Sequence, residues 1–587
     1  MKKLLLGFAA GLLLTHAANA QSATGNPQLA TLLNEYYETS ARLDPLSATF
    51  RGDARYNDQL PIDFTDSYRA ENRRTWQGFL AQLRAIDRTQ LPPADQLNYD
   101  VLRYDLLMQI ERLSLPENQI VFTQFSGLPQ SLALLGSGAS AQPFKTVADY
   151  DNWLKRASVF PAWSDSALVY FRKGIASGMV MPKVLVEKLV PQLNALVATD
   201  ISKSTFYKPV AQFPEGISDA DRQRLTAAFT SLIQEKLNPS YRKLAQFFQT
   251  EYLPSARATA GYGALPGGKK MYDFRVKQFT TTNLSADAIF NLGQKEVARI
   301  RHEMEAVKKQ VGFTGSLKEF FAYMRTDPKF YPYKDAEGIL NYYRSITPRI
   351  QPMLARMFNK VPKTPFEVRQ VEAFRAATAA AHYFAGSLEQ GRPGIFYVPI
   401  LDAAKTQSRE SLFLHEAIPG HHYQISLQYE NEALPKFRRY GFSTAYMEGW
   451  GLYAESLGKE LGVYTDPYQY MLALGDEMHR AIRLVVDAGM HARGWTREQA
   501  IQYSLDNEPI EEQRAVSEIE RYMAYAGQAL SYKMGELKIK ELRARYQKQL
   551  GSKFNLAAFH DALLMDGALP LDILERKMDA WAKAQLK

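Results

Sequence analysis

The spacing of the apolar residues constrains this chain more than any other feature. These residues recur three and four positions apart among charged residues, as in amphipathic helices. The clearest stretches are residues 29–43, 68–86, 286–311, 316–324, 335–357 and 366–386. Ser285 is predicted to cap the third of them. Alternating β-type patterns are scarce, and only residues 394–399 form a short β signal. The sequence therefore predicts a mainly α-helical protein with a small β element.

A cluster of glycine and proline at residues 261–268 is the best candidate for an internal boundary. Such a cluster cannot continue a helix. We therefore predict an N-terminal helical lobe over residues 21–262 and a C-terminal helical lobe over residues 263–587, arranged around a cleft. No internal repeat is present, which disfavours a solenoid.

The first 20 residues are predicted to be a signal peptide. Two lysines follow the first methionine, an apolar run extends from Leu4 to Leu14, and Ala18-Asn19-Ala20 forms a cleavage site, so we expect cleavage after Ala20. The run is about half of the ~20 residues that span a bilayer, and no later uncharged stretch is long enough. The mature protein is therefore expected to be periplasmic or secreted, without a membrane span.

Composition excludes several classes of function. The chain contains no cysteine, which removes disulfides, thiol nucleophiles, cysteine-ligated metals and a lipoprotein anchor. Any metal must therefore bind to histidine, aspartate or glutamate. Loss of two lysines with the signal peptide lowers the formal charge from +9 to +7, and no block of lysine and arginine is present. Nucleic acid is thus not an expected partner.

Three of the nine histidines, His415, His421 and His422, fall within eight positions, and Glu416 follows the first of them. Neutral imidazoles are zinc ligands, and a carboxylate beside them can act as general base for a metal-bound water. We therefore predict one Zn²⁺ ion at this cluster, with His415 as a ligand and Glu416 as the catalytic base.

The spacing of these histidines does not suit a straight helix. His421 and His422 lie six and seven positions after His415, which corresponds to a rise of about 9 or 10.5 Å. Pro419 must break or kink the helix, and Gly420 permits unusual backbone angles. Such a break could bring one later histidine back to the metal. We favour His421; His422 is the alternative ligand, or supports the site from outside. The competing interpretation is that the helix ends here and the histidine pair lies on the surface.

The third ligand is expected on a second helix, which begins near Ser443 or Thr444. Glu448 and Glu455 lie seven positions apart and share one face of that helix. We predict Glu448 as the third ligand, with Glu455 as an alternative or as a hydrogen-bond partner of a ligand histidine. Both could instead be ordinary exposed acids.

Other residues are candidates for contacts with the substrate or the reaction intermediate. His491 and Tyr532 could stabilise an oxyanion, and Asp487, four residues before His491, could orient it or contact substrate. Residues 395–398 could offer a free strand edge to an extended peptide, which makes Tyr397 a candidate substrate contact. Core packing and helix-surface pairing are the alternatives for these residues.

The quoted motifs resemble the DUF885 family. His-Glu-x-x-Pro-Gly-His-His-x-Gln stands here at residues 415–424, and Glu-Gly-Trp-x-x-Tyr-x-Glu at residues 448–455. The resemblance extends over most of the mature chain. It implies an exported, mainly helical relative of the zinc metallopeptidases, with a zincin-like architecture and glutamate as third ligand. The family's name assigns no activity.

Three hypotheses of function follow. The first is a zinc metallopeptidase that hydrolyses peptides with a metal-activated water and Glu416 as general base. The second is a zinc hydrolase of another amide or an ester, which a peptide-library digest would distinguish from the first. The third is a non-catalytic exported binding protein, which metal analysis would test.

Overall fold

The computed structural model describes residues 25–372, 380–388 and 391–587. The signal peptide predicted over residues 1–20 therefore lies outside the described residues. The chain is mainly helical, as the spacing predicts. Helices α1 (Pro27–Leu43), α3 (Asp66–Arg84), α13 (Ala286–Gln310) and α15 (Ala336–Met357) coincide with predicted stretches. Ser285 caps α13 as predicted, because its hydroxyl accepts the backbone N–H of Ala288 at 3.2 Å.

The helix predicted over residues 366–386 is wrong. This stretch contributes the strands β1 (Phe366–Gln370) and β2 (His382–Phe384), and its residues 373–379 lie outside the described part. Both strands pair with β3 (Gly394–Val398), β1 in parallel and β2 in antiparallel orientation. Hydrogen bonds to a strand further along the chain decide the conformation here, and local spacing does not report such pairing.

The free edge predicted over residues 395–398 is also wrong. The order of strands in the sheet is β1-β3-β2, so β3 is the central strand and pairs on both sides. Three of the five β3 residues are hydrophobic and buried, which suits a central strand.

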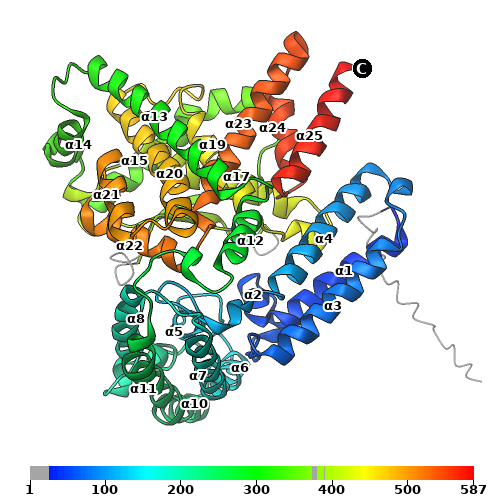
Figure 1. The fold of residues 1–587 in the computed structure, drawn as a ribbon, viewed down its shortest axis with the longest axis vertical. Helices are drawn as coiled ribbons and strands as arrows, with labels where there is room; N and C mark the ends of the chain where they lie inside the picture. Colours follow the sequence, from blue (N-terminus) through cyan, green and yellow to red (C-terminus); the bar gives the residue numbers. More distant parts are fainter. Residues whose placement is uncertain (1–24, 373–379, 389–390) are drawn as a thin grey trace, which may run out of the picture.

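Residues 122–252, together with Leu60 and Phe64, build one hydrophobic cluster. It is rich in aromatic side chains, among which Trp153, Phe160 and Phe171 are fully buried. Figure 1 shows its helices together at the bottom of the view. They are α5 (Leu128–Gly136), α6 (Val147–Ser158), α7 (Phe160–Ser177), α8 (Lys183–Ala195), α9 (Lys208–Ala211), α10 (Asp219–Ser231) and α11 (Asn238–Phe247).

A second cluster unites the two ends of the chain. Helices α1, α3 and α4 (Pro93–Arg112) share it with the sheet and with helices beyond residue 336. The latter are α15, α16 (Glu410–Glu416), α17 (His421–Glu430), α18 (Lys436–Arg439), α19 (Thr444–Ser456), α23 (Ser531–Leu550), α24 (Leu556–Leu564) and α25 (Leu571–Leu586).

A third cluster is built on the long helix α20 (Pro467–Arg493), which packs along α13. It also contains α12 (Gly268–Thr280), α14 (Leu317–Thr326), α21 (Arg497–Asn507) and α22 (Glu512–Ala524). Tyr262 lies in the short turn Tyr262–Ala264 and packs against this third cluster. The division of the chain into two lobes at this residue stays a prediction.

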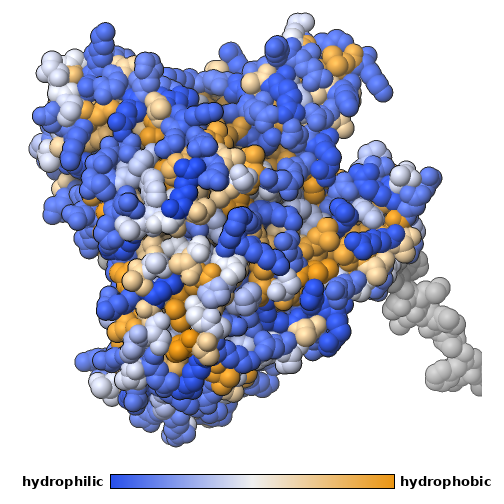
Figure 2. All heavy atoms as spheres, viewed as in Figure 1, coloured by the Kyte–Doolittle hydropathy of each residue, from blue (hydrophilic) through white to orange (hydrophobic). Residues whose placement is uncertain are grey.

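Hydrophilic residues predominate on the face drawn in Figure 2, with hydrophobic residues in smaller patches between them. Within the described ranges, no helix combines the length and the apolar character needed to span a bilayer.

Helices α19 and α23 cross at two glycines, which sets the position of α19. A Cβ atom on Gly535 would lie 1.8 Å from the carbonyl oxygen of Ala445, and one on Gly449 would lie 2.4 Å from the Cα atom of Gly535. No residue with a side chain fits between the two backbones. Gly449 directly follows Glu448, so this crossing fixes the backbone beside a predicted metal ligand.

We predict that Gly535→Ala destabilises the protein, because the added methyl group forces α19 and α23 apart. The expected loss is about 1–3 kcal/mol, the usual range for overpacking. Urea unfolding followed by circular dichroism measures it. Gly78→Ala is the control, since Gly78 lies within α3 with open space around it and should gain about 0.4–1 kcal/mol. Equal unfolding midpoints for the two variants would contradict the crossing.

Candidate metal centre

The helical hydrogen-bond pattern is interrupted between the first two histidines. Helix α16 ends at Glu416 and α17 begins at His421. Gly420 lies so close to α16 that a Cβ atom there would be 1.9 Å from the carbonyl oxygen of His415. The indole N–H of Trp450 donates to the carbonyl of Pro419 at 2.9 Å. The predicted break is confirmed, and it places the rings of His415 and His421 4.7 Å apart, nearly perpendicular.

Glu448 of α19 faces both of these rings. Its Oε2 atom lies 3.4 Å from Nε2 of His415 and 3.6 Å from Nε2 of His421. Donor atoms that bind one zinc tetrahedrally at about 2.1 Å are themselves about 3.4 Å apart. The spacing of the three donors therefore fits a metal ion, and this His, His, Glu group could hold one.

Glu455, two turns after Glu448, contacts His415 from the opposite side. The Nδ1–H group of His415 donates to Oε1 of Glu455 at 2.7 Å. In the neutral ring this bond fixes the tautomer of His415, so that Nε2 is the nitrogen that can bind a metal. Arg480 of α20 lies on the far side of Glu455, with Nη2 3.5 Å from the same oxygen.

The electrostatics show an excess of negative charge around His415. Burial alone would lower the pKa of His415, but its contacts with Glu448 and Glu455 outweigh burial and raise the pKa to about 10. Burial acts to raise the pKa of Glu448, yet both histidines together hold that pKa well below its usual range. Two carboxylates thus converge on one imidazole, an arrangement that a bound cation would neutralise.

His422 points away from this group. Its Nδ1 atom lies 3.0 Å from the hydroxyl of Tyr383 on β2, and its ring packs against Phe366 of β1. Burial lowers the pKa of His422 to about 4, so the ring is neutral. Of the two candidate histidines, His421 lies beside Glu448, whereas His422 packs against the β-sheet.

His491 and Asp487 are both engaged within the fold. Nδ1 of His491 accepts the backbone N–H of Tyr262 at 3.0 Å, so its Nε2–H donates to the carbonyl of Tyr522 at 3.1 Å. Burial lowers the pKa of His491 to about 3. With both nitrogens occupied, this ring has no N–H left for an oxyanion.

Asp487 does not orient His491 in this structure. Its carboxylate accepts the hydroxyl of Tyr272 at 2.6 Å and the backbone N–H of Gly527 at 3.1 Å. Burial raises the pKa of Asp487 to about 7. The aspartate therefore joins α20 to α12 and to the turn at Gly527.

The remaining candidates are half-buried. The ring of Tyr532 lies under the guanidinium of Arg483, 4.6 Å from its centroid. Tyr397 stacks on His382 of the neighbouring strand, with centroids 5.2 Å apart. Glu416 is the last residue of α16 and directly follows the ligand candidate His415.

The sequence did not predict two kinds of residue that position this site: the glycines of α19 and Arg480. The glycines that follow Glu448 allow close approach: a Cβ atom on Gly451 would lie 2.7 Å from the ring of His415. The regular Glu-Gly-Trp-Gly pattern was the available signal for this. Arg480 was missed as well, because an arginine 25 positions after Glu455 carries no local signal of the contact.

These residues lie within a region that matches a known family. The family model described as "Bacterial protein of unknown function (DUF885)" matches residues 45–578. The chain belongs to the DUF885 family. The expected resemblance is confirmed.

Two solved structures resemble the fold of this DUF885 protein. One is the putative lipoprotein from Colwellia psychrerythraea, 26% identical with a TM-score of 0.87, covering 95% of this chain and 99% of that chain. The other is a putative lipoprotein of unknown function from Shewanella oneidensis, 19% identical with a TM-score of 0.72, covering 94% and 99%. The search of curated proteins found no match.

We predict that His421→Ala abolishes stoichiometric metal binding whereas His422→Ala retains it. Only His421 faces Glu448, and loss of a direct ligand should exceed the roughly 10- to 100-fold effect of losing an outer partner. Metal analysis of protein purified without a histidine tag and reconstituted with Zn²⁺ gives the stoichiometry. Equal retention by both variants would contradict the assignment.

Metal affinity should fall as the pH is lowered, because a proton and a metal ion compete for His415. With a pKa of about 10 in the metal-free protein, His415 is protonated at neutral pH and must release that proton on binding. Affinity should change roughly tenfold per pH unit. Calorimetric titration in two buffers with different ionisation enthalpies counts the protons released. No release, with pH-independent affinity, would refute the coupling.

Proposed function

We propose that this DUF885 protein is an exported zinc-dependent hydrolase that cleaves peptides. The observation that carries the proposal is the spacing of the His415, His421 and Glu448 donors, with Glu416 directly after the first of them. Three protein ligands leave one position of a tetrahedral ion open, which is the arrangement of catalytic rather than structural zinc.

Bound zinc would polarise the substrate carbonyl and lower the pKa of a water molecule to near 7. Glu416 would take up a proton from the attacking water and then transfer that proton to the leaving amine. Glu455 keeps Nδ1 of His415 protonated, so that Nε2 remains the coordinating atom.

Tyr532 is the better of the two predicted oxyanion donors. His491 has both nitrogens engaged, whereas Tyr532 is half-exposed on α23, one turn before Gly535. Gly535 touches Gly449, which follows the ligand Glu448. We propose that Tyr532, close in sequence to this crossing of α19 and α23, donates its phenolic O–H to the substrate carbonyl.

The outer edge of β2 supports a peptide as substrate. Among the described strands, β2 pairs with β3 alone, and its Tyr383 contacts His422 at the beginning of α17. An extended peptide added to this edge would run past the helix that supplies His421. Tyr397 and Asp487 remain proposals as substrate contacts.

A zincin-like architecture with two helical lobes around a cleft is part of the same proposal, as is export by the predicted signal peptide. Two similar structures carry the name putative lipoprotein, whereas this sequence contains no cysteine for lipid attachment. We propose that the mature protein is free in the periplasm or secreted.

Glu416→Gln should retain zinc and lose peptide hydrolysis by at least about 100-fold, because the amide cannot accept the proton. Hydrolysis is measured by digesting a peptide library and identifying products by mass spectrometry, with ester substrates in parallel. Glu432→Gln, at an exposed acid beyond α17, is the matched control. Full activity of the Glu416 variant would remove the mechanism, and cleavage of esters alone would remove the peptide assignment.

A further inference from the structure

We infer that Arg480 of α20 is a positioning residue for the metal ligand His415 and acts through the carboxylate of Glu455. The inference rests on the proposed function, since it concerns the same metal site. It adds an outer layer to that site, supplied by a helix that contributes no ligand.

The contacts of Glu455 carry the inference. Its side chain is buried, with Oε1 2.7 Å from Nδ1 of His415 and 3.5 Å from Nη2 of Arg480. Its other oxygen, Oε2, is buried without a hydrogen-bond partner in the described part of the chain. A single carboxylate oxygen thus lies between the imidazole and the guanidinium. Arg480 is the cation placed to hold that oxygen toward His415.

The guanidinium of Arg480 is itself held. Its Nη1 donates to the backbone carbonyl of Asp476, one turn earlier on α20, at 2.9 Å. Its side chain is only 15% exposed. The arginine therefore cannot swing freely into solvent, and its position follows that of α20.

Asp476 joins α20 directly to the beginning of α16, the helix that carries His415. Its carboxylate accepts hydrogen bonds from the guanidinium of Arg409 at 2.6 Å and from the hydroxyl of Ser411 at 2.7 Å. Ser411 lies one turn before His415 on α16. Helix α20 therefore contacts α16 in two ways. Asp476 binds the first turn of α16, and Arg480 contacts Glu455, which binds the ring of His415.

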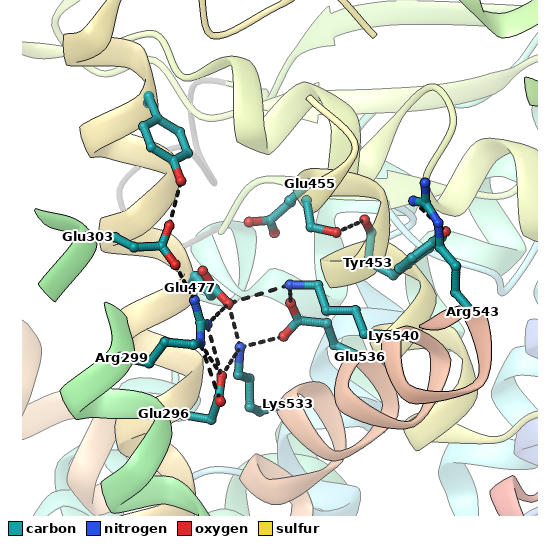
Figure 3. Close-up of polar contacts among 12 residues, drawn as sticks. Glu296, Arg299, Glu303, Tyr453, Glu455, Glu477, Lys533, Glu536, Lys540 and Arg543 are labelled. Carbon is teal, nitrogen blue, oxygen red and sulfur yellow. Dashed lines mark hydrogen bonds and ion pairs between the residues drawn. The ribbon is translucent and has the colours of Figure 1, made fainter. Parts of the chain in front are cut away.

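The register of α20 is fixed at the neighbouring residue, Glu477. Figure 3 shows Glu477 among Glu296 and Arg299 of α13 and Lys533, Glu536 and Lys540 of α23. The fully buried ammonium of Lys533 lies 2.6 Å from Glu477, 3.1 Å from Glu296 and 2.7 Å from Glu536. A shift of α20 along its axis would break these ion pairs. They therefore fix the position of Arg480 relative to Glu455.

The test is the zinc affinity of the full chain, measured by competition with a chelator. We expect Arg480→Gln to bind zinc roughly 10-fold more weakly than wild type, and Glu455→Gln roughly 10- to 100-fold more weakly. The double variant should be no weaker than Glu455→Gln alone, because Arg480 acts only through that carboxylate. Arg480→Lys should recover part of the affinity.

Arg493→Gln is the matched control. It removes another arginine of α20 and its ion pair with Asp287, at 2.8 Å, and should bind zinc like wild type. Hydrolysis at saturating zinc is the second readout: Arg480→Gln should regain most of the wild-type rate there, since a positioning defect in metal binding is overcome by excess metal. If Arg480→Gln does not fold, the same cycle is run with Arg480→Lys.

The possible results separate the inference from the function on which it rests. Wild-type affinity in Arg480→Gln, or losses that multiply in the double variant, would overturn the role of Arg480 and leave the metal site intact. Absence of zinc binding by the wild-type chain would overturn the metal site and the inference together. Equal weakening in Arg493→Gln would show a general effect of charge on α20 and would also overturn the inference.

Discussion

The two imidazoles face each other because the backbone ceases to be helical between them. Four residues separate α16 from α17, and within them Gly420 rests against the carbonyl oxygen of His415. Trp450 of α19 donates to the carbonyl of Pro419 and so holds the break against the helix that carries Glu448. Without this interruption the histidines would be separated along a helix axis by about 9 Å and could share no ion.

The other elements of the site are held by contacts of two different kinds. Backbone proximity positions α19, whose glycines leave no space between it and α23 or the His415 ring. Buried charges position α20, through Lys533 and its three carboxylates. Close packing sets distances, whereas a buried ion group fixes register, because a shifted charge would lose its partners in a medium that does not solvate it. The candidate metal centre lies between the closely packed helix α19 and helix α20, which the buried ion group positions.

Local sequence patterns predicted what depends on local chemistry. The long amphipathic helix with its Ser285 cap, the break at Pro419, and the preference for His421 all follow from backbone sterics and helix geometry. Glu448 was predicted from a shared helix face, but the contact of the next residue, Gly449, with Gly535 of α23 was not. The stretch 366–386 was predicted as a helix because the strand that pairs with both of its ends begins only at Gly394.

Burial was the other quantity that the sequence could not supply. His491 carries the same type of ring as His415, with an acid at helical spacing before it, yet it is buried with both nitrogens bonded to the backbone. The function of a histidine depends on which of its nitrogens remain free, and that depends on the folding of distant segments. Arg480 illustrates the converse, a residue without local signal whose partner is brought to it by packing.

The raised pKa of His415 between two carboxylates bears on the order of folding and metal binding. Because a protonated imidazole offsets part of the negative charge of these acids, the group is partly compensated before any metal ion binds. The polypeptide can then complete its folding before a metal ion binds. Metal binding at this group would then replace one cation, the proton, by another in a chain that has already folded.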